Sequence, residues 1–158
     1  MQGKCMSFSG KPTVLIDERI GNDGFWPDLS VAEFQKGYRL PAEYLVDLLV
    51  ADLTMAMIEV NTDLAKLKAR WQGAGVSNVE SADTTVLPER TFQAATYKRA
   101  VYSRAKASLL TQFATVNRRE SAENVGKELP ERSETFLAFS QAAVRSLQGR
   151  GRITVALL

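Results

Sequence analysis

Residues 40–71 carry an apolar stripe that repeats with the period of an α-helix, and this stripe limits the fold more than any other feature. Pro41 suits the first turn of a helix, and Gly73 and Gly75 end the segment. About 30 residues at 1.5 Å each give a helix of roughly 45 Å. The stripe consists of Leu45, Leu49, Leu53, Ala56, Val60, Leu64, Leu67 and Trp71.

A second apolar set lies on another face of the same helix, at an angle of more than about 100° around the helix axis from the first stripe. It consists of Tyr44, Leu48, Ala51, Met55 and Ile58. A helix of a small monomer normally buries one face only. Two apolar faces therefore predict either the central helix of a bundle or a helix that keeps one face for a neighbouring subunit.

Two helices with clear boundaries flank this segment. Ser30 is a suitable N-cap for a short helix over residues 31–38, and Glu33 completes a capping box. Pro130 opens the last helix, which ends near Gln148, before Gly149 and Gly151. The side chains of the last helix that we expect to point inward are Phe136, Phe139, Ala143, Val144 and Leu147.

A second long helix is predicted from about Pro88 to Arg118, after a polar loop over residues 73–87. Its apolar stripe consists of Phe92, Ala95, Tyr102, Leu109, Phe113 and Val116. Residues 119–129 are charged and indicate another loop. The pattern predicts an all-α bundle of three to four helices, two of them long.

The two ends of the chain differ from this helical pattern. Residues 1–24 predict an extended N-terminal arm with a strand at Thr13–Ile16 and a turn at 21–24, and residues 25–149 a helical domain. In the tail, residues 150–158, apolar alternation favours a strand. A lone strand needs a partner edge. The tail could pair with the arm of its own chain, add to a sheet of another protein, or fray.

The composition argues against most enzymes. The chain of 158 residues contains no histidine, which removes Ser-His and Cys-His nucleophile pairs and every histidine-containing metal site. Apolar residues make up 45% and charged residues 24%, as in a globular protein. The single Cys5 cannot form an internal disulfide, and no apolar run suits a signal peptide or a membrane span. We expect a protein of the reducing cytoplasm that does not contact a membrane.

Sequence motifs of catalysis or cofactor binding are missing as well. We find no nucleotide-binding, zinc-protease or nucleophile-elbow pattern. Glu59 and Asp63 lie one helical turn apart, which could direct two oxygens towards Mg²⁺, but a solvated helix face explains them better. Asp47 and Asp52 do not share a face. We therefore expect no enzymatic activity, no bound metal and no cofactor.

The charge is distributed unevenly although the net charge is only +2. Residues 88–119 contain seven Lys/Arg and one acid, a balance of +6, whereas residues 28–71 contain seven acids and five bases, a balance of −2. The bases form no aligned row of the kind that reads a DNA groove. They indicate either a solvated face or pairing with the acidic helix of an adjacent copy. A small nucleic-acid-binding module that uses residues 90–119, including Arg118 and Arg119, is the alternative function.

Several short motifs resemble the head completion/stabilisation (GpL) proteins of contractile-tailed bacteriophages over residues 25–158. These motifs are Phe25-Trp26-Pro27-Asp28-Leu29, Asn61-Thr62-Asp63-Leu64, Tyr97-Lys98-Arg99-Ala100-Val101, Ala107-Ser108-Leu109-Leu110 and Arg152-Ile153-Thr154-Val155. Their order and spacing carry the resemblance. The N-terminal arm does not take part in it.

The resemblance implies a structural protein of the virion neck, assembled in the host cytoplasm. Such a protein would bind beneath the portal as a ring of identical subunits, about twelve as in helical connector proteins. Packaged double-stranded DNA would pass through the ring, and later neck or tail terminator proteins would dock on it. The family implies no catalytic residues.

Three sets of residues are the candidate sites. The tail that would bind the portal or a neighbouring subunit comprises Arg150, Arg152, Ile153, Thr154, Val155, Leu157 and Leu158. The predicted subunit interface comprises Tyr44, Leu48, Met55, Ile58, Lys98, Arg99, Arg104 and Lys106. The predicted N-terminal packing motif comprises Phe25, Trp26 and Pro27.

Overall fold

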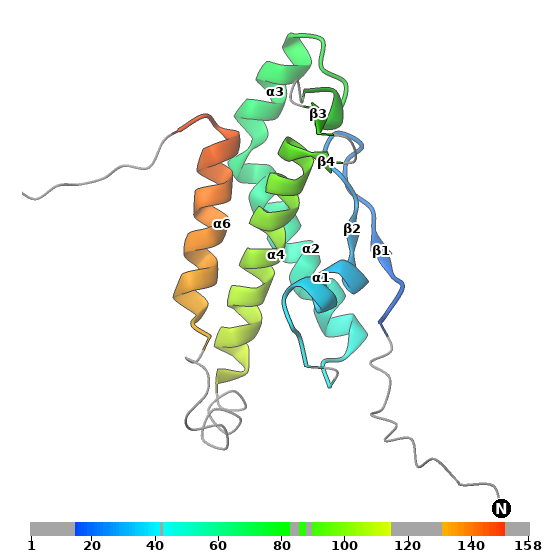
Figure 1. Cartoon of the computed structure of the whole chain (residues 1–158), viewed down its shortest axis with the longest axis vertical. Helices are drawn as coiled ribbons and strands as arrows, with labels where there is room; N and C mark the ends of the chain where they lie inside the picture. The colour runs from blue at the N-terminus through cyan, green and yellow to red at the C-terminus, as the bar shows by residue number, and fades with distance from the viewer. Residues whose placement is uncertain (1–14, 42, 83–85, 88–89, 115–130, 151–158) are drawn as a thin grey trace, which may run out of the picture.

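The computed structural model describes residues 15–41, 43–82, 86–87, 90–114 and 131–150. In this part of the chain the fold is mostly helical and carries two small antiparallel sheets, which agrees with the predicted helical class. The helix α4 (Phe92–Gln112) packs against both α2 (Val46–Asp63) and α6 (Ser133–Leu147) (Figure 1). The described part also contains the shorter helices α1 (Val31–Gly37) and α3 (Ala65–Gly73).

The ends of α1 are determined by hydrogen bonds to the backbone. Oγ of Ser30 accepts the Glu33 amide hydrogen at 3.2 Å, which confirms Ser30 as the N-cap. At the other end Arg39 takes a positive φ of 49°, and the Leu40 amide donates to the carbonyl of Gln35 at 3.2 Å. This arrangement is a Schellman motif without its usual glycine.

The second helix begins later than predicted and is interrupted. Leu40 closes α1, so the helix predicted to open at Leu40-Pro41 begins at Val46 instead. Leu45, a predicted stripe residue, is the N-cap and is 75% exposed. At Leu64 (φ −99°, ψ 3°) the helix breaks, and α3 (Ala65–Gly73) follows. The Thr62 hydroxyl donates to the Ile58 carbonyl at 2.8 Å, a bond that often bends helices.

Most of the remaining stripe is inside the protein as predicted. Its buried members are Leu49, Leu53, Ala56, Val60, Leu64 and Leu67, and Trp71 packs against the core from a partly buried position. The glycine that ends α3 is Gly75, whose φ is 89°. The Val76 amide reaches the Trp71 carbonyl at 3.0 Å.

The helix predicted over 88–118 is shorter, and it is the central helix of the fold. A hairpin of β3 (Val86–Leu87) and β4 (Arg90–Thr91) precedes α4, so Pro88 does not open a helix. Phe92 and Ala95 are exposed, which corrects two predicted stripe positions. Tyr102 and Leu109 are buried, and Phe113 packs against the core. Val116 lies outside the described residues.

The buried residues of α4 are not confined to one side of the helix. Consecutive residues from 100 to 103 and from 105 to 107 are all buried, because α2 covers one side and α6 another. The central helix, which was one of the two alternatives predicted for residues 40–71, is therefore α4 in the structure.

The last helix, α6, begins at Ser133 rather than at Pro130. Ala143, Val144 and Leu147 are buried as predicted. Phe136 is only partly buried and Phe139 is 40% exposed, so these two rings face less inward than predicted. Gly149 has a φ of 69°, and the next amide, at residue 150, donates to the carbonyl at residue 145 at 2.9 Å. This geometry confirms the predicted end of the helix.

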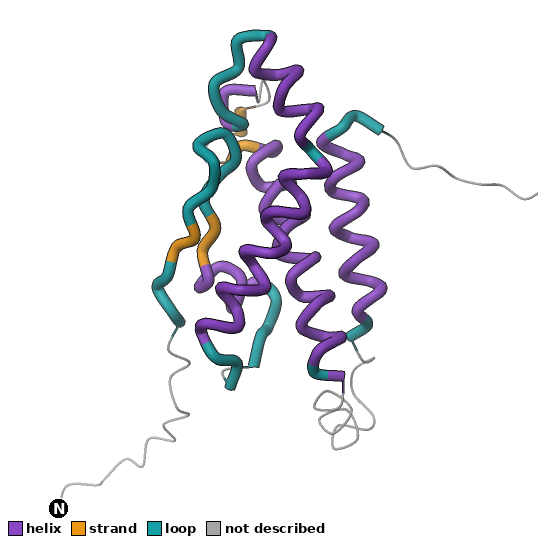
Figure 2. The backbone as a smooth tube through the Cα atoms, turned by 180° about the vertical axis from the view of Figure 1, so that it is seen from behind, coloured by secondary structure: helices purple, strands orange, loops and turns teal. Residues whose placement is uncertain are grey.

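The N-terminal segment belongs to the fold from residue 16 onward. Residues 15 and 16, the described part of the predicted strand, are not in a strand, and the strand of this segment is β1 (Arg19–Ile20). It pairs antiparallel with β2 (Leu29–Ser30) beside the helices (Figure 2). Ile20 is buried. Residues 1–14 of the predicted arm, including residues 13–14 of the predicted strand, lie outside the described part of the chain. Residues 151–158 of the predicted tail lie outside it as well.

An aromatic cluster joins this segment to the helices. Phe25 and Trp26 are each 2% exposed, and the Trp26 ring stacks on Tyr97 with centroids 4.7 Å apart. The ring of Trp71 lies against the rings of Phe25 and Trp26, with centroids about 6 Å apart in each pair. The carbonyl of Pro27 accepts a hydrogen bond from Asn22 at 3.0 Å. The turn at residues 21–24 thus closes onto the core.

Candidate interaction site

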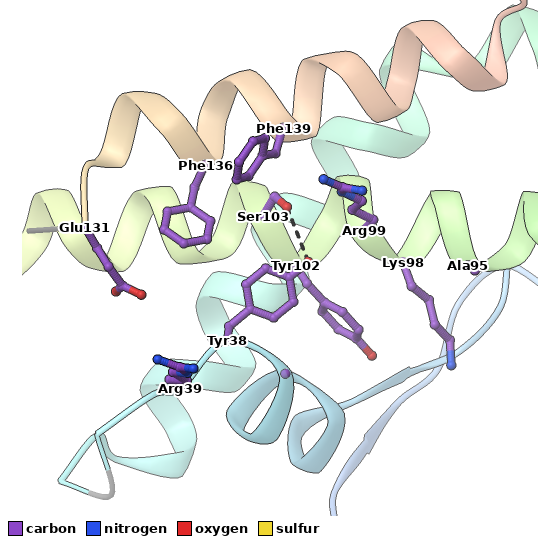
Figure 3. Close-up of a pocket in the computed structure, with 11 residues that line it drawn as sticks. Tyr38, Arg39, Ala95, Lys98, Arg99, Tyr102, Ser103, Glu131, Phe136 and Phe139 are labelled. Carbon is purple, nitrogen blue, oxygen red and sulfur yellow. Dashed lines mark hydrogen bonds between the residues drawn. The ribbon is translucent and has the colours of Figure 1, made fainter. Parts of the chain in front are cut away.

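An open groove of about 580 Å³ lies between α1, α4 and α6 (Figure 3). On α4 it is lined by residues at positions 95, 98, 99, 102 and 103, which share one helical face. The α4 residues that hydrogen-bond to α2, at positions 97, 104, 108 and 112, lie on the other side. The groove therefore faces away from α2.

Aromatic side chains make up the apolar part of this groove. Tyr38 at the end of α1 lies 5.9 Å from the Tyr102 ring and 6.1 Å from the Phe136 ring. Phe136 and Phe139, on successive turns of α6, meet edge to face at 5.9 Å. Figure 3 shows both rings on the side of α6 that borders the groove. Burial raises the pKa of Tyr38 and of Tyr102, so both groove hydroxyls stay protonated.

Three cationic residues, Arg39, Lys98 and Arg99, and one acid, Glu131, line the groove next to these rings. The guanidinium of Arg99 lies 5.3 Å from the centre of the Phe139 ring, and its side chain is exposed. Nζ of Lys98 bonds to both carboxylate oxygens of Glu33, at 3.0 and 3.1 Å. The groove thus combines an apolar aromatic surface with charged side chains of both signs.

Glu33 connects α1 to α4 at the edge of the groove. Its carboxylate accepts the Tyr102 hydroxyl hydrogen at 2.8 Å, and the same hydroxyl accepts the Ser30 amide hydrogen at 3.0 Å. The predicted capping box is therefore completed by Tyr102 rather than by Glu33. Burial alone would raise the pKa of Glu33, but the hydrogen bonds from Lys98 and Tyr102 outweigh it and hold this pKa below its ordinary value.

Arg104 lies on the opposite side of α4 and joins three helices. Its Nη2 is 2.8 Å from Oδ2 of Asp63, and its Nη1 is 3.5 Å from Oε2 of Glu59. Its Nε donates to Oγ of Ser140 in α6 at 3.2 Å. The two acids considered for Mg²⁺ therefore bind a guanidinium. Among the described residues, no group of three or more acids, histidines and cysteines forms an arrangement that could hold a metal ion.

Lys106 is an internal cation as well. It is 3% exposed, and its Nζ lies 2.7 Å from the Glu131 carboxylate and 3.1 Å from the carbonyl of Tyr38. Lys98, Arg104 and Lys106 thus have carboxylate partners within their own chain. These three cations therefore need no acidic partner from an adjacent copy. They also do not form the row of unpaired charges that the alternative nucleic-acid function would use.

The outer face of α2, which we define as Ala51, Met55 and Ile58, points away from α4. Met55 is 58% and Ile58 52% exposed. Leu48 and Tyr44, which belong to the same predicted set, are partly buried, and Tyr44 packs on Phe113 with centroids 5.1 Å apart. The structure thus brings Met55 and Ile58 together on one surface and places Lys98 and Arg99 on another.

Sequence reasoning missed Tyr38 as a site residue and assigned Phe136 and Phe139 to the core. The signal available for the two phenylalanines was their spacing of three residues, which puts them on one helix face but does not say whether that face is covered. Of the predicted tail, the structure describes Arg150 alone. No helix in the described residues has the length and apolar content that crossing a membrane requires.

Comparison with known proteins gives one family. The family model described as phage head completion protein (GPL) matches residues 20–158. A curated protein of Haemophilus phage HP1, named "Probable head completion/stabilization protein", is 33% identical over 151 residues, which cover 96% of this chain and 99% of the relative. No solved structure gives a significant match.

Proposed function

Because the chain belongs to the phage head completion protein (GPL) family, we propose that it acts as a neck adaptor that binds beneath the portal as a ring. Family membership confirms the resemblance read from the sequence, and it makes the protein a structural component of phage head assembly. The ring, the portal contact and the docking of later neck or tail proteins are the proposal. In this arrangement packaged DNA passes through the ring.

The exposed apolar outer face of α2 is the main support for the proposed ring. Met55 and Ile58 lie one turn apart and each exposes more than half of its surface, while the opposite side of the same helix is in the core. Contiguous exposed apolar surface on a small protein marks a contact with another protein. A head-to-tail contact would place this face against a different surface of the next copy, which is the geometry that generates rings.

The subunit contact is mainly apolar in this proposal. Arg104 and Lys106 are occupied by carboxylates of their own chain. We therefore assign the contact to Met55 and Ile58 rather than to ion pairs between the second and third helices of adjacent copies.

The tail is the proposed contact with the portal or the neighbouring subunit. Ile153, Val155 and Leu157 alternate along it and give one apolar side. Truncation after Gly151 removes all three. If portal binding and head stability survive this truncation unchanged, the tail has no such role.

The decisive experiment is native mass spectrometry and negative-stain imaging of the full chain, alone and mixed with the portal of the same phage. We expect a ring that caps the portal. The double variant Met55→Ser/Ile58→Ser should prevent ring formation, whereas Leu137→Ser, which changes an exposed apolar residue of α6, should not. A chain that stays monomeric and does not bind the portal would contradict the adaptor function. A ring that persists in the double variant contradicts the α2 contact alone.

A further inference from the structure

A small hollow of about 190 Å³ lies where the end of α6 meets the break between α2 and α3. Its lining residues are Asp63, Lys66, Leu67, Arg70, Gln148 and Arg150. We propose that this basic hollow binds the phosphate backbone of double-stranded DNA. The proposal rests on the proposed function, which places DNA in the channel of the ring, and it names the surface of each subunit that faces this DNA.

The two chain segments that line the hollow carry bases and few acids. The helix α3 contains Lys66, Lys68 and Arg70 and no acid. Residues 135–150, which lead through α6 to Arg150, contain no acid either. Lys66 and Arg70 are four residues apart, so they lie on one face of α3. The fold adds Arg150 to this pair of cations.

Gln148 fixes the end of α6 beside the break (Figure 1). Its Nε2 donates to the carbonyl of Asp63, the last residue of α2, at 3.0 Å. Gly149 then turns the chain with its φ of 69°, and the Arg150 amide donates to the carbonyl at residue 145 at 2.9 Å. The backbone on both sides of the hollow is therefore held by hydrogen bonds.

The three cations of the hollow are not neutralised within the described part of the chain. The side chains of Lys66, Arg70 and Arg150 are exposed and form no ion pair with another described residue. Asp63 also lines the hollow, but its carboxylate lies 2.8 Å from Nη2 of Arg104. Exposed cations of one sign around a concave surface attract an anionic partner.

The chemistry of the lining favours phosphates over a protein surface. Of the described residues that line the hollow, Leu67 alone is apolar, and it is 4% exposed. The centre of a protein interface is apolar and poor in lysine, whereas contacts to the DNA backbone are made by arginine and lysine. A duplex carries one negative charge per about 1.7 Å of its axis, so it can meet all three cations at once.

The direction of the hollow fits the proposed ring. At about 100° per residue, Asp63 lies about 110° around α2 from the centre of the outer face. The outer face is assigned to the neighbouring subunit, so the hollow lies on a different side of the subunit and stays open when that contact forms. A surface that faces the channel must meet this condition.

The first test measures binding of the full chain to a short labelled duplex by fluorescence anisotropy, between about 50 and 200 mM salt. The triple variant Lys66→Gln/Arg70→Gln/Arg150→Gln should weaken binding at least about tenfold. It should also reduce the slope of log K against log salt by about 2–3, because each lost phosphate contact removes about 0.9. Duplexes of unrelated sequence should bind equally, since backbone contacts carry no sequence information.

The matched control is Lys36→Gln/Arg99→Gln/Arg132→Gln, which removes the same charge from three exposed bases outside the hollow. It should weaken binding less than about threefold, because salt screens distant charges. Equal losses in the two triple variants overturn the proposal, since binding then follows net charge alone. No binding at about 100 µM protein and 50 mM salt overturns it as well. So does a hollow variant that binds DNA normally but no longer caps the portal, because the hollow then binds a protein.

The second test places a photoreactive probe in the assembled neck. Full chains with Arg70→Cys in a Cys5→Ser background carry the probe on the new thiol and are assembled on DNA-filled heads. We expect cross-links to DNA from position 70 and few from Lys36→Cys, an exposed position of α1. Equal cross-linking from the two positions, or none from position 70, overturns the proposal.

The two proposals fail separately. The hollow includes neither Met55 and Ile58 nor the aliphatic residues of the tail, so its triple variant should still form the ring on the portal. A chain that binds DNA through the hollow but never caps the portal contradicts the neck adaptor alone. A ring on the portal whose position 70 does not cross-link to DNA contradicts the DNA contact alone.

Discussion

The hydroxyl of Tyr97 in α4 donates a hydrogen bond to Oδ1 of Asn61 in α2. The same hydroxyl accepts a hydrogen bond from Asn22 at 2.8 Å, and Asn61 donates to Oδ1 of Asn22 at 3.0 Å. Three side chains from the N-terminal turn, α2 and α4 therefore form a closed ring of hydrogen bonds next to the stacked Trp26.

Tyr97→Phe should lower the free energy of unfolding by about 1–3 kcal/mol, because the partly buried amide groups of Asn22 and Asn61 each lose a hydrogen-bond partner. Urea denaturation measures the change. Tyr38→Phe is the control, since the Tyr38 hydroxyl contacts Oγ of Ser103 at a longer 3.3 Å, and its effect should be smaller. Equal losses in the two variants would contradict the importance of the asparagine ring.

The ion pair between Arg104 and Asp63 should contribute measurably to stability. A double-mutant cycle of Arg104→Ala and Asp63→Ala is expected to give a coupling energy of about 1 kcal/mol, because the Arg104 side chain is largely buried and the Asp63 carboxylate is partly exposed. The cycle with Glu59→Ala should give less, since that contact is 3.5 Å long. A larger coupling to Glu59 than to Asp63 would show that the pairing differs in solution.

Glu33 should make the stability of the protein depend on acidity. Burial opposes ionisation, but the hydrogen bonds from Lys98 and Tyr102 lower the pKa of Glu33 below its ordinary value. Its stabilisation is therefore complete above the unfolded-state pKa and is lost as the pH falls through the folded-state pKa. Glu33→Gln should cost no more than about 1 kcal/mol at pH 7, because the carboxylate is half exposed.

Denaturation of wild type and Glu33→Gln from pH 7 to pH 3 checks this dependence. The difference in free energy of unfolding between the two should shrink below the unfolded-state pKa. Asp23, whose pKa is also lowered, keeps its own acid dependence in both proteins and cancels in the difference. A difference that stays constant over this range would mean that Glu33 does not titrate as described.

Two glycines with equal space around them should respond to alanine in opposite directions. A Cβ at Gly149 or at Gly73 would meet nothing within 4 Å. Gly149 has a φ of 69°, so Gly149→Ala should destabilise the end of α6 by about 1 kcal/mol. Gly73 is the last residue of α3, and Gly73→Ala should stabilise by about 0.5–1 kcal/mol. Thermal unfolding distinguishes the signs, and equal signs would contradict the assigned backbone conformations.

Helix ends were predictable where a residue type carries its own backbone preference. Ser30 caps α1 because its hydroxyl accepts a neighbouring amide, and Gly149 ends α6 because glycine adopts a positive φ without strain. Arg39 takes the corresponding conformation at the end of α1. An arginine gives no such signal, so the start of the next helix was placed too early.

The candidate site was less predictable than the helices. Lys98 and Arg99 were chosen as interface residues from the sequence, and both line the groove. Tyr38, which lies on a different element, was missed because the groove exists only where α1, α4 and α6 meet. Arg104 and Lys106 were chosen for the same interface, yet each binds a carboxylate of its own chain.

The amino-acid order alone is enough for the helical class, the caps at Ser30 and Gly149, and the family, because each depends on neighbouring residues or on motifs in a given order. Packing determines which helix is central. Periodicity assigns residues to a face but does not say which element covers it, so the sequence leaves the central helix as one of two alternatives for residues 40–71, and in the structure α4 lies between α2 and α6. The same holds for Glu33, whose partner Tyr102 is 69 positions away and meets it only in the folded chain.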